Sequence, residues 1–107
     1  MNTLHLILKR KWYDMIASGE KKEEYREMTS HWVKRLCENV TCNFNVATGE
    51  IKVQGEIKNF DTVCFHLGYT KTTMTFKIDY IEAGQGYPGW GAEPGKQYFV
   101  IKLGERL

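Results

Sequence analysis

The sequence predicts an α+β domain with a mostly antiparallel sheet or small barrel, and three observations lead to this fold class. The chain has 107 residues, which suits one domain, 1–107, and leaves little room for two. Apolar residues make up 42%, which is enough for a packed core and argues against a disordered chain. The expected order is strand, helix, strand and helix, followed by several consecutive strands, and such an order favours α+β.

The first elements follow from residue spacing. Leucines at alternate positions of residues 4–9 predict a strand with one apolar face. The next segment is a short helix, and Gly19 ends it because glycine adopts the left-handed C′ conformation at little cost. Residues 21–27 lack a helical apolar stripe and are expected to be extended. On that strand Glu24 and Arg26 share one face.

A second helix and a hairpin are expected next. Thr29 or Ser30 caps a helix whose apolar side chains recur at helical spacing up to Leu36. Alternating apolar residues on both sides of the turn 47–50 predict a hairpin. Because the segment is polar overall, we interpret 38–58 as a hairpin insertion at the periphery.

The C-terminal half consists of strands and one unusual loop. Alternating apolar residues predict strands over 63–67, 74–80 and 98–103. The loop 84–95 contains five of the ten glycines and both prolines. It lacks the Gly-Lys-Ser/Thr of a phosphate-binding P-loop. Tyr87 and Trp90 of this loop could cover a bound base, or the tryptophan could fill one end of the sheet.

Positive charge is concentrated in the first third of the chain. The whole chain carries +2, too little to coat nucleic acid through charge alone. Residues 1–36 hold eight basic and five acidic residues, a balance of +3, whereas 37–107 hold seven and eight, a balance of −1. A surface that binds an anion is therefore expected in 1–36. The alternative is that these charged residues only form the solvent-exposed faces of two helices.

Cysteine usage bears on the compartment. Cys37, Cys42 and Cys64 lack close C-x-x-C spacing, which favours reduced thiols in a cytoplasmic protein. The three histidines are scattered, so we expect no metal and no cofactor. Cys64 and His66 share a strand face, but a packed thiol is the commoner role there. Neither a secretory signal nor a membrane span is expected, and we expect a monomer.

Lys9, Lys21, Glu24 and Arg26 are the candidate site. A short strand–helix–strand unit can bring Lys9, at the end of the first strand, close to the other three. The cations suit a phosphate, and Glu24 could accept a hydrogen bond from a base or hold Arg26 in place. The alternative is an ordinary solvated strand of charged residues.

The segment Gly19-x-Lys21-x-x-Glu24-x-Arg26 resembles the G-x-K-x-x-E-x-R signature of the ASCH domain family, a branch of the PUA-like fold. The resemblance covers residues 3–36 and 60–103. It implies a small β-barrel of about six mostly antiparallel strands, with two short helices flanking a cleft that binds RNA or nucleotides. Lys9, Lys21, Glu24 and Arg26 would line the cleft. Trp12 would stack on a base or pack in the core.

The resemblance leaves three functions open. The first is an RNA- or nucleotide-binding module. The second is a small amidohydrolase or nuclease, because some ASCH-like proteins hydrolyse acetylated cytidine and others are linked to RNA cleavage. The amidohydrolase type resembles this chain in using the lysine of the motif, which is Lys21 here. It has a threonine at the position of Glu24. It also needs a downstream glutamate, for which Glu82 is the candidate. The third is a protein-interaction module that uses the glycine-rich loop or the hairpin edge.

Overall fold

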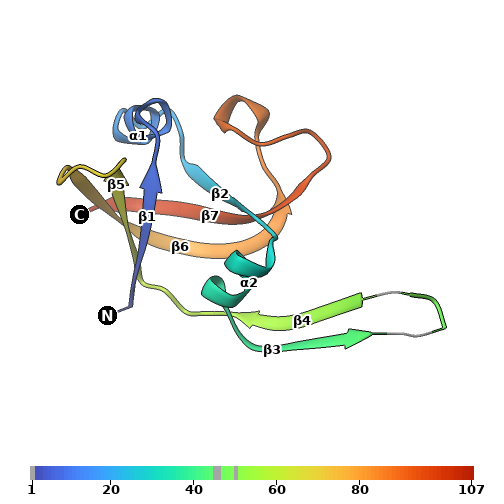
Figure 1. Cartoon of the computed structure of the whole chain (residues 1–107). Helices are drawn as coiled ribbons and strands as arrows, with labels where there is room; N and C mark the ends of the chain where they lie inside the picture. The colour runs from blue at the N-terminus through green and yellow to red at the C-terminus, as the bar shows by residue number, and fades with distance from the viewer. Residues whose placement is uncertain (1, 45–46, 50) are drawn as a thin grey trace. The chain divides into compact units, whose positions relative to one another are not determined.

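The computed structural model describes residues 2–44, 47–49 and 51–107 and confirms an α+β fold (Figure 1). No helix in these ranges is long and apolar enough to cross a membrane. The elements are β1 (Thr3–Leu8), α1 (Arg10–Ala17), β2 (Glu23–Glu27), α2 (Ser30–Leu36), β3 (Cys37–Phe44), β4 (Ile51–Ile57), β5 (Thr62–Leu67), β6 (Thr73–Gln85), the 3₁₀ turn η1 (Pro88–Trp90) and β7 (Gln97–Arg106).

The chain divides into two compact units, which we describe separately. The sheet unit comprises Met1–Glu27 and Asn59–Leu107, and the hairpin unit comprises Met28–Lys58. The sheet unit contains a five-stranded sheet in the order β1-β5-β6-β7-β2. β1 and β5 are parallel, and the other three neighbouring pairs are antiparallel. The prediction of a mostly antiparallel sheet is therefore confirmed.

In the part of the chain that the structure describes, the sheet is a barrel-like half-barrel and not a closed barrel of about six strands (Figure 1). The sheet has five strands and is curled, with β1 and β2 as its two edges (Figure 1). One side chain bridges these edges, since Arg26 Nη2 of β2 donates a hydrogen bond to the Ile7 carbonyl oxygen of β1 at 3.2 Å. Alternating apolar residues predict individual strands. Whether the sheet closes into a barrel depends on the distance between its two edge strands, which the alternation does not determine.

One face of the sheet forms the core. Three alternate leucines of β1 are at most 3% exposed, as predicted, and Val63 and Phe65 of β5 are fully buried. Each such side chain stabilises the fold by about 1.5–3 kcal/mol relative to an exposed one. Ile16 of α1 is also buried, so the helix belongs to the same core.

The turn after α1 places the start of β2. Ser18 is the C-cap, and Gly19 follows with φ +85°, the left-handed conformation predicted for it. The chain then turns back, and the Lys21 amide donates a hydrogen bond to the Met15 carbonyl oxygen at 3.0 Å. This turn brings the charged motif directly from the helix onto an edge strand.

The hairpin unit consists of α2 and the antiparallel pair β3–β4. Thr29 caps α2 as predicted, because its hydroxyl accepts a hydrogen bond from the Trp32 amide at 3.4 Å. The register of β3 shifts around Asn39, which has φ +55°, a conformation that asparagine tolerates better than most residues. Val46 and Glu50 of the predicted hairpin lie outside the described residues.

Candidate functional site

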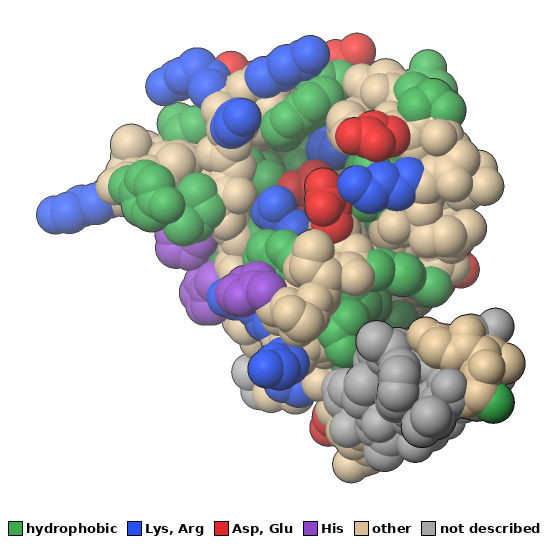
Figure 2. All heavy atoms as spheres, turned by 45° about the vertical axis from the view of Figure 1, so that its right-hand side comes forward, with side chains coloured by type: hydrophobic (Ala, Val, Ile, Leu, Met, Phe, Trp, Pro, Cys, Tyr) green, Lys and Arg blue, Asp and Glu red, His purple; other side chains and the backbone are tan. Residues whose placement is uncertain are grey.

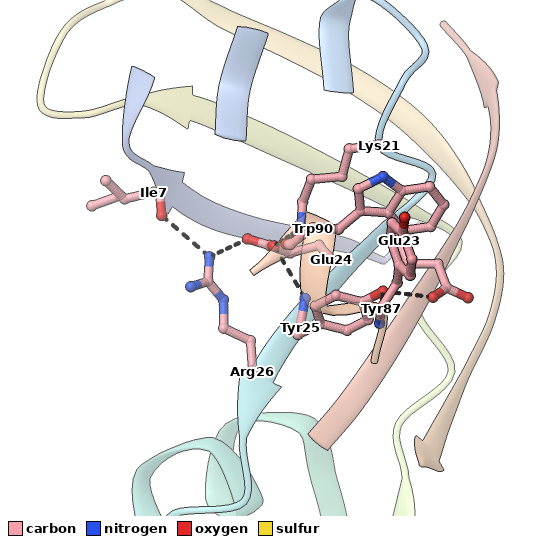
Figure 3. Close-up of polar contacts among 8 residues, drawn as sticks. All are labelled: Ile7, Lys21, Glu23, Glu24, Tyr25, Arg26, Tyr87 and Trp90. Atoms are coloured by element: carbon pink, nitrogen blue, oxygen red, sulfur yellow. Dashed lines mark hydrogen bonds and ion pairs between the residues drawn. The ribbon is translucent and has the colours of Figure 1, made fainter. Parts of the chain in front are cut away.

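Lys21, Glu24 and Arg26 form a connected ion cluster at edge strand β2 (Figure 3). Lys21 Nζ lies 3.2 Å from Glu24 Oε1, and Arg26 Nη2 lies 3.1 Å from Glu24 Oε2. One carboxylate therefore bridges two cations, and the cluster carries a net charge of +1. The structure thus brings together three of the four charged residues that the sequence nominated, with Glu24 and Arg26 on one strand face as predicted.

The cluster is mostly withdrawn from solvent. Lys21 is 2% exposed and Glu24 is 5% exposed, whereas the Arg26 side chain keeps 19% of its surface. Burial lowers the pKa of Lys21, and the neighbouring Glu24 opposes that shift. An unpaired buried charge costs several kcal/mol, so each cation depends on the shared carboxylate. Arg26 is the member through which the cluster meets solvent.

Lys21 also ties the glycine-rich loop to β2. Its ammonium group donates a hydrogen bond to the Trp90 carbonyl oxygen. The same nitrogen lies 4.7 Å from the centre of the Tyr25 ring and 5.0 Å from the centre of the Trp12 ring. At these distances the two rings make cation–π interactions with the ammonium group, and these interactions help to compensate the cost of burying its charge.

Tyr25 makes a second link between β2 and the loop (Figure 3). Its hydroxyl accepts a hydrogen bond from the Tyr87 amide at 2.9 Å and donates one to Glu23 Oε1 at 2.7 Å. Burial raises the pKa of Tyr25, so the phenol stays protonated and can keep donating. Tyr25 therefore has a structural role, because it holds the loop against β2.

Glu23 connects β2 to Tyr25 and to β7. Its side chain keeps 13% of its surface, binds Tyr25 and forms an ion pair with Lys102 of β7. The antiparallel register places Glu23 directly opposite Lys102. This contact joins residues far apart in the sequence, so no local pattern could have predicted it.

The loop aromatics differ in exposure. Tyr87 is 57% exposed, and its ring meets Trp90 edge-on with centroids 5.0 Å apart. Trp90 is half-buried and packs on the core cluster that contains Tyr25 and Tyr98. Of the two, Tyr87 therefore offers ring surface to a ligand, while Trp90 anchors the loop.

Trp12 and Lys9 occupy different surroundings. Trp12 is half-buried beside Gly91, where an added Cβ would lie 3.1 Å from its ring, and Lys11 Nζ lies 4.6 Å from the ring centre. These contacts support packing of Trp12 in the protein over stacking on a ligand.

Lys9 is the exposed N-cap of α1. Among the described residues its ammonium group makes no ion pair or hydrogen bond with the cluster, so the structure does not unite Lys9 with Lys21.

The surface is hollowed where charged side chains meet. Figure 2 shows acidic and basic side chains together in a hollow, with hydrophobic side chains around it. A separate cavity of about 290 Å³ shares only Lys21 with the ion cluster; it is lined by Ile16, Gly19, Lys21, Lys22, Phe76, Leu103 and Gly104. The alternative catalytic candidate Glu82 is exposed on β6, opposite Val100 of β7.

Comparisons with known protein families, with curated proteins and with solved structures gave no match. The ASCH resemblance therefore depends on the motif and on its position after α1. Lys21 and Arg26 each contact Glu24 directly, so the three charged residues of the motif form one cluster.

Proposed function

We propose that the protein is a PUA-like, ASCH-type module that binds RNA or a nucleotide at Arg26. The observation that carries the proposal is the ion cluster, in which one carboxylate serves two cations and leaves a net charge of +1. Arg26 is its most exposed member. A partly buried guanidinium held in a fixed orientation suits a phosphate or a base edge.

The residues of the site have different roles in this proposal. Arg26 contacts the ligand, and Tyr87 supplies a ring on which a base stacks. Lys21 and Glu24 are positioning residues, since they hold Arg26 and the backbone of Trp90. Positioning by buried ions reduces the ordering cost of binding, because the guanidinium is already oriented.

Replacing Arg26 with glutamine is expected to weaken binding of a short fluorescein-labelled single-stranded RNA at least about tenfold, because a charged hydrogen bond contributes about 1.5–3 kcal/mol. Fluorescence anisotropy at several salt concentrations measures this. If Arg26 binds a phosphate, the slope of log affinity against log salt also falls by about 0.7. Tyr87→Leu should weaken binding without changing that slope.

The matched control is Lys22→Gln, which removes the same charge from an exposed neighbour on the same segment. We expect it to change affinity much less than Arg26→Gln. Equal losses in both variants would show that the RNA responds to overall charge, and the proposed site would be wrong. Circular dichroism of each variant checks that the fold is intact.

A second candidate function, hydrolysis of an amide such as that in acetylated cytidine, is favoured by one observation. Burial lowers the pKa of Lys21 beside Glu24. A neutral amine keeps two N–H groups, which suffice for Glu24 and the Trp90 carbonyl, and it gains a lone pair. Such an amine could act as a general base.

If Lys21 is that base, hydrolysis is expected to rise with pH as the amine loses its proton. The lowered pKa moves this rise below the range of an ordinary lysine. Chromatography of acetylated cytidine incubated with the protein across pH measures turnover. Lys21→Met should abolish it while preserving the packing of the aliphatic chain. Absence of turnover at high protein concentration would exclude this activity.

A further inference from the structure

A cluster of His5, Cys64 and His66 lies apart from the ion cluster, on the two neighbouring strands β1 and β5. His5 is directly opposite Cys64 in the parallel register, and His66 lies two residues further along β5. The contacting histidines are 61 residues apart in the sequence. Only the parallel pairing of an N-terminal strand with a central one brings these side chains together.

The three side chains lie on the outer face of the sheet. His5 alternates with two buried leucines of β1, and Cys64 lies between the buried residues Val63 and Phe65. Since neighbouring residues of a strand point to opposite faces, His5 and Cys64 point away from the core. His5 is exposed and the other two are half-buried, so the cluster is open to solvent.

The potential ligand atoms are close enough to share one ion. His5 Nδ1 lies 3.0 Å from His66 Nε2, and these two nitrogens and the Cys64 sulfur all lie within 4.8 Å of one another. In a tetrahedral zinc site, with Zn–N of about 2.0 Å and Zn–S of about 2.3 Å, ligand atoms are about 3.3–3.7 Å apart. Small side-chain rotations would therefore give this geometry.

The chemistry of the three groups selects among metals. Two imidazoles and a thiolate are borderline-to-soft ligands, which suit Zn²⁺, whereas Ca²⁺ and Mg²⁺ need oxygen ligands. The pairing strand β6 places Thr75 opposite Cys64 and Thr73 opposite His66, so no carboxylate comes from that side.

We propose that His5, Cys64 and His66 form a zinc site that connects edge strand β1 to β5. The three side chains supply two nitrogens and one sulfur, and water completes the tetrahedron. Binding releases the Cys64 thiol proton to solvent, and both facing imidazole nitrogens bind as lone-pair donors. The ring protons therefore reside on His5 Nε2 and His66 Nδ1. This site is independent of the RNA-binding proposal.

The experiment is a titration of the chelator-treated full chain with Co²⁺, followed by displacement with Zn²⁺. We expect one Co²⁺ per chain, with visible bands of a tetrahedral ion and a thiolate-to-cobalt charge-transfer band. Zn²⁺ should remove these bands and raise the thermal midpoint of unfolding. Cys64→Ser should lose the charge-transfer band. This variant retains Cys37 and Cys42, so loss of the band would assign it to the Cys64 thiolate.

His5→Gln should weaken Co²⁺ binding at least about tenfold. Loss of a residue that only hydrogen-bonds to a metal ligand already lowers metal affinity by about this factor, and His5 is itself a proposed ligand. His5 is exposed, so this variant should fold like the wild type, which circular dichroism checks. His31→Gln, at an exposed histidine of α2, is the matched control and should bind normally. Failure of the wild type to bind Co²⁺, or an unchanged charge-transfer band in Cys64→Ser, would overturn the proposal and leave a hydrogen-bonded histidine pair.

Discussion

Replacing Glu24 with glutamine is expected to lower the free energy of unfolding by about 3–5 kcal/mol, the cost of removing one partner from a buried ion pair. The substitution keeps the shape of the side chain but leaves the Lys21 ammonium and the Arg26 guanidinium without their shared carboxylate. Lys21 is only 2% exposed, so water cannot solvate its ammonium group in place of the lost carboxylate charge. Urea unfolding followed by circular dichroism measures the change.

Glu27→Gln is the matched control for this prediction. Glu27 is on the same strand and forms an ion pair with Lys96 at 3.3 Å, but its side chain is 58% exposed. Exposed ion pairs contribute about 0–1 kcal/mol, so the control should barely change stability. Similar losses in the two variants would mean that the buried cluster contributes no more than a surface pair.

Replacing Gly86 with alanine is expected to destabilise the protein by about 1–3 kcal/mol through overpacking. An added Cβ would lie 2.6 Å from the Ala92 Cβ and 2.7 Å from Tyr25 Cζ, and contacts this short require movement. The Tyr25 hydroxyl holds the Tyr87 amide, so we also expect the loop to shift and RNA affinity to fall.

Gly84→Ala provides a close control, two residues earlier on β6. An added Cβ at Gly84 would meet no atom within 4 Å, so both stability and RNA binding should stay near wild type. Thermal unfolding and anisotropy compare the two variants. If Gly86→Ala matched Gly84→Ala in both measurements, the close packing of the loop on Tyr25 would not matter for the site.

Several local features of the fold were predictable because they depend on short-range chemistry. The alternate leucines of β1, the left-handed Gly19 and the Thr29 cap each follow from a few neighbouring residues. The proximity of Glu24 and Arg26 follows in the same way, since residues two apart share a strand face. The strand count of the sheet was less predictable, because it depends on which strands pair.

The residues themselves specify the elements and nominate Lys21, Glu24 and Arg26, since strand periodicity, helix ends and charge are local properties. Tertiary structure decides the remaining features. It buries Lys21 against Trp90, sets Glu23 opposite Lys102 and brings His5 to Cys64. Each of these contacts joins distant segments through strand register or loop docking. Burial then determines the lysine pKa, because desolvation acts only once the chain has packed around the charge.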